Sequence, residues 1–459
     1  MLLSINRYAW PVFRKECSAL AVLALPMMLA QMATVGVGLV DTAMAGAAGK
    51  DDLAAVALGS SAMSLVLITL IGVMTALNPM IAQLFGAGKT EAVGRLGRQG
   101  LWFGLMVGTA GMVLLLAAVR PLMWYLDLGG AVESMLAQYL VFAALGMPAA
   151  MLHRALHAYV SSLNKPKAVM WISWAALFLN IPLNYVFVYG RFGLPALGGA
   201  GCGLATMLVF WFNAAALWLY VKKNRYFVPF GLTGGFSRPD KAALKQIWRL
   251  GWPIGASYFL EVSLFSLIVF LVAKFGADSV AAQQIVISIT SVVYMIPQAL
   301  GAAATVRVGY ALGRGRRQQA RYISGVAVVS GMVLAVCTML FLILAREPLA
   351  AAFTPDADVR ALAASVLLLA AWFQFFDFGQ CIASYALRGY KITKAPMLVH
   401  AAAFWGMGLL PGYYFANGFQ MGIFGFWTAL ILSLAAASGL LLWLLERHSG
   451  RVARERGLV

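Results

Sequence analysis

Apolar stretches recur along almost the whole of this 459-residue chain. A run of ~20 apolar residues is long enough to cross the ~30 Å hydrocarbon core of a bilayer as a helix. Hydrophobic residues make up 62% of the chain and charged residues only 11%, whereas soluble domains carry about 25% charged residues. We therefore expect an all-α membrane protein, with spans at residues 17–41, 53–84, 99–120, 134–156, 168–190, 197–221, 250–273, 279–306, 322–345, 361–387, 395–416 and 420–445.

The net charge of +18 reflects membrane topology rather than nucleic-acid binding. Twelve spans place both termini on one side, and only six of the 34 lysines and arginines fall on the other: Lys50, Arg120, Arg191, Lys274, Arg346 and Arg360. Cytoplasmic loops carry the excess of basic residues in membrane proteins. We therefore predict that both termini are cytoplasmic, with contacts to the lipid bilayer and none to nucleic acid.

The two halves of the chain are related by a constant shift of 227 residues. Residues 49–55 (GKDDLAA) align with residues 276–282 (GADSVAA), and Pro26 aligns with Pro253. Each half holds six spans, so both copies have the same orientation, as in transporters with parallel repeats. The predicted organisation is an N-terminal lobe at 1–225, a cytoplasmic linker at 226–245 and a C-terminal lobe at 246–459.

Acidic residues inside apolar spans are the strongest functional signal. Glu261 lies 12 residues after Arg249 and 13 before Lys274, which places it ~18 Å along a helix from either charge. Asp377 is similarly deep, and Asp41 ends the first span. A charged side chain at the bilayer centre costs ~2.5–3.5 kcal/mol on insertion scales, so it persists where it has a partner. A cation, a proton or a polar cavity would serve, and so would a protonated carboxyl bonded to a neighbouring helix.

Other polar and aromatic residues share helix faces with these acids or with one another. Asn180 and Asn184 are one helical turn apart and so face the same way. They serve either as hydrogen-bonding links between helices or as part of an ion site with Asp41. Phe265 is one turn after Glu261, and an aromatic ring beside a carboxylate suits a lipophilic cation.

Several function classes are disfavoured by what the sequence lacks. Gly88-Lys89-Thr90 ends like a phosphate-binding loop, but Gln83 stands where that motif requires glycine. No hydrolase motif is found, so we do not expect an enzyme or a cofactor. The four cysteines lack CxxC spacing, so neither a metal cluster nor a disulfide framework is predicted.

Five segments resemble the MATE (multidrug and toxic compound extrusion) family, in particular its bacterial NorM-type branch. They are residues 24–46 (ALPMMLAQMATVGVGLVDTAMAG), 77–89 (LNPMIAQLFGAGK), 180–185 (NIPLNY), 198–206 (GGAGCGLAT) and 380–391 (QCIASYALRGYK). The resemblance covers essentially the whole chain. It implies a V-shaped pair of six-helix lobes related by a parallel pseudo-twofold repeat, and export of drugs coupled to cation entry.

The resemblance also implies roles for individual residues. Glu261 and Asp377 would bind a monovalent cation, with Tyr294 and Gln284 beside them. Asp41, Asn180 and Asn184 match a polar cluster of the N-terminal lobe, which would couple to ions. This chain has Asn184 and Cys202 where other branches carry Asp and Thr, which lowers the charge of that cluster. Substrate contacts are implied for Asp41, Ser61, Glu261, Phe265, Asp356 and Asp377.

The function predicted from the sequence and the resemblance is an antiporter of the bacterial inner membrane that exchanges Na⁺ or H⁺ for cationic, aromatic drugs or dyes, acting as a monomer. One alternative is a major-facilitator transporter, but residues 86–99 (GAGKTEAVGRLGRQ) lack the aspartate of its loop motif. The other is a flippase of lipid-linked intermediates, for which more basic residues within the spans would be expected. The sequence does not distinguish Na⁺ from H⁺, because a carboxylate accepts either.

Overall fold

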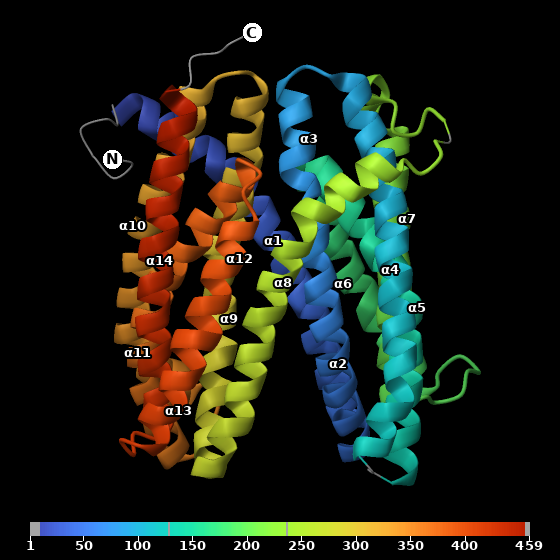
Figure 1. Cartoon of the computed structure of the whole chain (residues 1–459). Helices are drawn as coiled ribbons and strands as arrows, with labels where there is room; N and C mark the ends of the chain where they lie inside the picture. Colours follow the sequence, from blue (N-terminus) through green and yellow to red (C-terminus); the bar gives the residue numbers. More distant parts are fainter. Residues whose placement is uncertain (1–9, 127–128, 236, 455–459) are drawn as a thin grey trace. The chain divides into compact units, whose positions relative to one another are not determined.

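A computed structural model of the chain describes residues 10–126, 129–235 and 237–454. The elements in these ranges are all helical (Figure 1). The first half contains α1 (Trp10–Ala48), α2 (Lys50–Met74), α3 (Leu77–Gly86), α4 (Thr90–Leu126), α5 (Gly130–Ser162), α6 (Pro166–Tyr189) and α7 (Gly199–Lys223). A short helix, η2 (Arg225–Phe230), follows in the linker.

The second half repeats this pattern. Its elements are α8 (Lys241–Val272), η3 (Ala273–Phe275), α9 (Ala277–Gly313), α10 (Arg317–Ala351), α11 (Ala357–Gly389), α12 (Lys394–His400), η4 (Ala401–Leu409), α13 (Leu410–Asn417) and α14 (Ile423–Arg454). Each of the twelve predicted spans coincides with one of these helices or with a run of adjoining ones. The prediction of an all-α membrane fold is therefore confirmed.

Within the described residues, eleven helical segments are long and apolar enough to cross a membrane. The predicted span missing from these segments is the eleventh, at 395–416, and it is broken into α12, the π-helical η4 and α13. The span predicted at 53–84 is interrupted between α2 and α3. Pro79 explains this second break, because a proline has no N–H to donate to the carbonyl four residues earlier, that of Thr75.

Contacts divide the chain into two compact units. One contains residues 26–255, and the other contains the start of α1, up to Leu25, together with the chain from Ala256 onward. Thus α1 and α8 each contribute to both units. Leu20 and Leu23 of α1 pack in the core of the second unit, while Ile247 of α8 packs in the core of the first. The lobe boundaries derived from the repeat, at 225 and 246, remain a prediction.

The unit of residues 26–255 is organised around α5, which packs against α4 on one side and α7 on another. Glycines allow this close approach: a Cβ on Gly203 of α7 would lie 2.9 Å from the carbonyl oxygen of Tyr139 in α5. Small residues promote helix packing in membranes in this way. In the other unit, α11 occupies the equivalent position and packs against α9, α10 and α14 (Figure 1).

Residues of the linker fold back onto the unit of residues 26–255. Phe227, Phe230 and Leu232 are buried in one of its cores. Gly94 of α4 makes room for this segment, because a Cβ there would lie 1.7 Å from the carbonyl oxygen of Phe230. The linker is therefore packed against the ends of the membrane helices.

Candidate ion and substrate sites

Asp41 is the centre of a buried polar network in the unit of residues 26–255. Its Oδ1 accepts hydrogen bonds from the side-chain amides of Asn180 (3.1 Å) and Asn184 (2.7 Å), both on α6. Its Oδ2 accepts one from the hydroxyl of Thr206 on α7 (2.6 Å). The thiol of Cys202, one turn before Thr206, donates to the backbone carbonyl of Asp41 (3.5 Å). Three helices therefore meet at one carboxylate.

Helical spacing explains why this network forms. Asn180 and Asn184 are four residues apart and present both amides on one face of α6. Cys202 and Thr206 have the same spacing on α7. All four side chains, like that of Asp41, are almost completely inaccessible to solvent, and buried polar groups of this kind are stable only when they are hydrogen-bonded.

Two oxygen atoms of this network have no partner. The side-chain amides of Asn180 and Asn184 donate to Asp41, but their Oδ1 atoms are buried and accept no hydrogen bond in the structure. An unsatisfied buried acceptor costs about 1–3 kcal/mol. Carbonyl-type oxygens are also ligands that hard cations accept, so these two atoms fit a cation or a bound water.

Glu261 and Asp377 come together in the other unit. Glu261 of α8 is close enough to Asp377 of α11 for an electrostatic interaction, and Tyr294 of α9 is its hydrogen-bonding partner. The amide of Gln380 donates to Oδ1 of Asp377 (2.8 Å). Among the described residues, neither carboxylate forms an ion pair with a lysine or an arginine. That these two acids form an ion site with Tyr294 remains a prediction.

A chain of hydrogen bonds continues from Asp377 into the eleventh span. The oxygen of the Gln380 amide lies 2.9 Å from Nε2 of His400, at the end of α12. The π-helical η4 begins at the next residue, and Trp405 within it donates to the carbonyl of Leu260 in α8 (3.2 Å). The irregular segment therefore contacts both helices that carry the acids, and π-helical segments are frequent at functional sites.

Arg388 of α11 interacts electrostatically with Glu261. Its guanidinium is held elsewhere: it stacks 4.0 Å from the centre of the Tyr385 ring and donates to the hydroxyl of Tyr258 (3.2 Å). The two tyrosine hydroxyls are themselves 2.5 Å apart. Arg388 thus contributes positive potential without neutralising either carboxylate directly.

Other residues singled out from the sequence are not joined to these clusters by described contacts. Gln284 is exposed on α9, ten residues and about 15 Å from Tyr294 along the helix. Ser61 is exposed on α2, and its hydroxyl donates to the carbonyl of Ala57 (2.7 Å). Asp356 caps the N-terminus of α11 by accepting from the backbone of Asp358 (2.9 Å). Their roles in ion or substrate binding remain predictions.

Three residues of the clusters were not selected from the sequence. Thr206 and Gln380 lie within segments that carry the family resemblance, and His400 lies in the eleventh span. For two of them, helical spacing from a residue already selected was a signal that could have identified them in the sequence. Thr206 is one turn from Cys202, and Gln380 is three residues from Asp377, a spacing that brings side chains together on a helix surface.

The MatE family model matches the chain twice, at residues 26–186 and 253–414. Both matches begin at the prolines that the internal repeat aligns, so the predicted repeat is confirmed. Family membership also decides against the major-facilitator alternative.

Close relatives match the chain from end to end. The sequence is 61% identical to the probable multidrug resistance protein NorM of Neisseria meningitidis serogroup B, over 100% of both chains. It is 46% identical to the protein of the same name from Chromobacterium violaceum, over 100% of both chains. It is 37% identical to the multidrug resistance protein PmpM of Pseudomonas aeruginosa, over 96% of this chain and 94% of that protein.

A solved structure agrees with these sequence matches. The MATE transporter NorM-NG, solved in complex with a small molecule and a monobody, is 56% identical and has a TM-score of 0.81, covering 95% of this chain and 96% of its own. The eukaryotic MATE transporter AtDTX14, at 22% identity and a TM-score of 0.86, shares the fold over 96% of this chain and 99% of its own. The chain therefore belongs to the MATE family, whose members are membrane transporters and not enzymes.

Proposed function

We propose that this transporter is a multidrug antiporter that exports cationic, aromatic compounds in exchange for a monovalent cation, Na⁺ or H⁺. The names of its relatives support drug export, and the solved structure of NorM-NG holds a small-molecule ligand. The distribution of basic residues supports an inner-membrane location with both termini in the cytoplasm.

The observation that carries this proposal is the pair Glu261 and Asp377 within one helical bundle. Both lie in apolar spans, and within the described chain no lysine or arginine forms an ion pair with either. Two like charges close together disfavour each other, so a bound cation or proton relieves their repulsion. The Tyr294 hydroxyl next to Glu261 adds a neutral oxygen ligand.

Coupling follows if the ion and the drug favour opposite conformations of the transporter or compete for the same carboxylates. A ligand with equal affinity for two states shifts neither, so the carboxylates must bind the two ligands differently. Each charge that crosses the membrane with the field contributes ~2.3 kcal/mol per 100 mV. In a one-for-one exchange with a monovalent cationic drug these field contributions cancel, so the concentration gradient of the coupling ion drives export, and each tenfold ratio supplies ~1.4 kcal/mol.

Aromatic rings next to the acids suit a cationic drug. Phe265 is one helical turn from Glu261 and packs against Phe373, with ring centres 6.0 Å apart and planes at 83°. Rings attract organic cations through their π faces. Phe265 and the two carboxylates are therefore the proposed substrate contacts of this unit.

The Asp41 network is proposed as the ion or substrate site of the other unit. Turning over the side-chain amides of Asn180 and Asn184, whose nitrogens now donate to Asp41, would bring their unpartnered oxygens to the carboxylate, where they would complete the coordination of a cation. Because this cluster carries one acid, it would contribute less to coupling than the pair of acids does.

Dye efflux from proteoliposomes tests the proposal. The purified chain is reconstituted with an ethidium-like dye, and either a Na⁺ gradient or a pH gradient is then imposed. We expect one of these gradients to accelerate efflux, and the gradient that does so identifies the coupling ion. Glu261→Gln should abolish the acceleration, because the variant retains the shape of the side chain but loses its charge.

Glu347→Gln is the matched control. It makes the same chemical change at a glutamate whose side chain is 76% exposed, at the end of α10, and should leave efflux unchanged. Equal efflux with and without both gradients would contradict the antiporter. Normal gradient-driven efflux by Glu261→Gln would remove Glu261 from the coupling site.

A further inference from the structure

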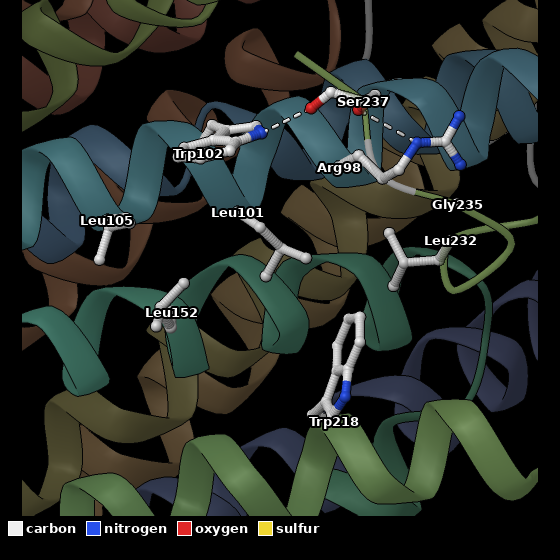
Figure 2. Close-up of a pocket in the computed structure, with 9 residues that line it drawn as sticks. All are labelled: Arg98, Leu101, Trp102, Leu105, Leu152, Trp218, Leu232, Gly235 and Ser237. Atoms are coloured by element: carbon white, nitrogen blue, oxygen red, sulfur yellow. Dashed lines mark hydrogen bonds between the residues drawn. The ribbon is translucent and has the colours of Figure 1, made fainter. Parts of the chain in front are cut away.

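A groove of about 240 Å³ lies in the unit of residues 26–255, away from the Asp41 network. Its walls come from α4, α5, α7 and the linker (Figure 2). Since α4 and α7 both pack against α5, the groove runs over α5 between them and is closed at one end by the linker. Its lining is not shared with either polar cluster described above.

The groove is amphipathic along its length. Leucines from α4 and α5, Leu101, Leu105 and Leu152, form an apolar floor, whereas Arg98 and Ser237 stand at the linker end (Figure 2). Trp102 joins the two parts, because its indole donates to the carbonyl of Ser237 (2.8 Å). A ligand with a polar head and an apolar tail matches this arrangement.

Arg98 is held in place but keeps a free donor. Its Nε donates to the hydroxyl of Ser237 (3.2 Å), and its Nη1 donates to the carbonyl of Gly231. No described residue accepts from its Nη2. The indole N–H of Trp218, whose ring projects from α7 beside the groove (Figure 2), likewise has no acceptor in the described chain. An arginine positioned in this way is a favourable ligand for a phosphate group.

The groove lies at the depth of a lipid headgroup. The 37 residues of α4 measure about 55 Å, so a helix centred on the ~30 Å hydrocarbon core extends about 12 Å beyond it at each end. Arg98 is eight residues, about 12 Å, from the start of α4 at Thr90. Tryptophans such as Trp102 and Trp218 are enriched at the same boundary.

The rim of the groove is basic. Arg95 is one turn before Arg98 on α4, Lys222 is one turn after Trp218 on α7, and Arg238 follows Ser237 in the linker. All three side chains are exposed. Basic clusters beside membrane helices attract anionic lipids over zwitterionic ones.

We propose that this groove binds one anionic phospholipid, with its phosphate on Arg98 and Trp218 and an acyl chain over Leu101, Leu105 and Leu152. The lipid would connect α4, α7 and the linker. Lipid binding in this groove would be independent of how ion and drug transport are coupled.

Native mass spectrometry of the delipidated, full-length protein tests this site. The protein is titrated with phosphatidylglycerol or with phosphatidylcholine of the same chain length. We expect wild type to bind one phosphatidylglycerol about tenfold more tightly than phosphatidylcholine. Arg98→Gln removes the phosphate ligand, and Leu105→Trp fills the apolar part without changing the charge. Each should weaken phosphatidylglycerol binding about tenfold.

Lys89→Ala is the control, because it removes an exposed cation from the turn before α4 that does not line the groove. It should bind phosphatidylglycerol as wild type does. If Arg98→Gln fails to fold, Leu105→Trp still decides the question. Unchanged binding by Leu105→Trp, equal affinity of wild type for the two lipids, or full competition by soluble glycerol phosphate would each overturn the proposal.

Discussion

The two polar clusters stabilise their buried carboxylates in different ways. In the unit of residues 26–255, the single acid Asp41 accepts three side-chain hydrogen bonds from Asn180, Asn184 and Thr206. In the other unit, Glu261 and Asp377 are two acids, and each has one side-chain donor, Tyr294 and Gln380 respectively. The first carboxylate is satisfied by neutral donors, whereas the other two have fewer donors per charge.

This difference indicates a structural role for Asp41 and a transport role for Glu261 and Asp377. Neutral donors that converge on a carboxylate stabilise its charged form within the fold, so Asp41 links α1, α6 and α7. Glu261 and Asp377 lack that compensation and therefore depend more on an added cation or proton. Charge removal should consequently affect stability at Asp41 and transport at Asp377.

The largest effect is expected for Asp377→Asn. This variant can still accept the hydrogen bond from Gln380, so its melting temperature in detergent should equal that of wild type. Loss of coupling to a tenfold ion gradient removes ~1.4 kcal/mol, which lowers the steady-state dye gradient about tenfold. Dye accumulation in vesicles under an imposed ion gradient measures it. A large fall in melting temperature with transport intact would reverse the assignment.

Asp41→Asn should produce the opposite pattern. An amide nitrogen would replace one of the two carboxylate oxygens and face either the two asparagine donors or the Thr206 hydroxyl, so at least one buried donor would lose its acceptor. We expect a loss of about 3 kcal/mol in the free energy of unfolding, measured from the shift of the detergent-denaturation midpoint. Residual gradient-driven transport by the folded fraction should remain. If stability is unchanged, the network does not hold the three helices together.

Much of the fold could be predicted from the sequence, because span length and charge position are set by the membrane. The interruptions could not all be predicted in this way. The π-helical η4 carries no local sequence signal, since its residues 401–409 (AAAFWGMGL) are uniformly apolar. The division of α1 at Leu25 and of α8 at Gly255 between the two units depends on side-chain packing, which the repeat does not encode.

The acids of the site were predictable for a related reason. A carboxylate in an apolar span is costly and therefore conspicuous, so Asp41, Glu261 and Asp377 could be selected. Uncharged partners such as Thr206, Gln380 and His400 cost less in a membrane helix than a carboxylate does, and hydrogen bonding between helices is an ordinary use of such residues. Their importance depends on which helices are neighbours, and that becomes visible only in three dimensions.

Thr206→Val probes one arm of the Asp41 network. The substitution keeps the branched shape but removes the hydroxyl that donates to Oδ2 of Asp41. A hydrogen bond to a charged group contributes about 2 kcal/mol, so a loss of that size is expected in the denaturation midpoint. In the Asp41→Asn background the same change should cost clearly less, because its charged acceptor is already gone. Additive losses would mean that Thr206 acts independently of Asp41.

Cys202→Ser should have the smallest effect. The thiol donates to the backbone carbonyl of Asp41 and not to its carboxylate, and a serine hydroxyl can make the same contact. The free energy of unfolding should therefore change by less than about 1 kcal/mol, and dye efflux should be unchanged. Cys202→Ala, which removes the donor, serves as the comparison and should be slightly less stable. If the dependence of dye efflux on the ion gradient changed markedly in Cys202→Ser, this side chain would instead lie at the bound ion. The Asp41 network would then be an ion site like the Glu261–Asp377 pair, which its hydrogen bonds alone do not indicate.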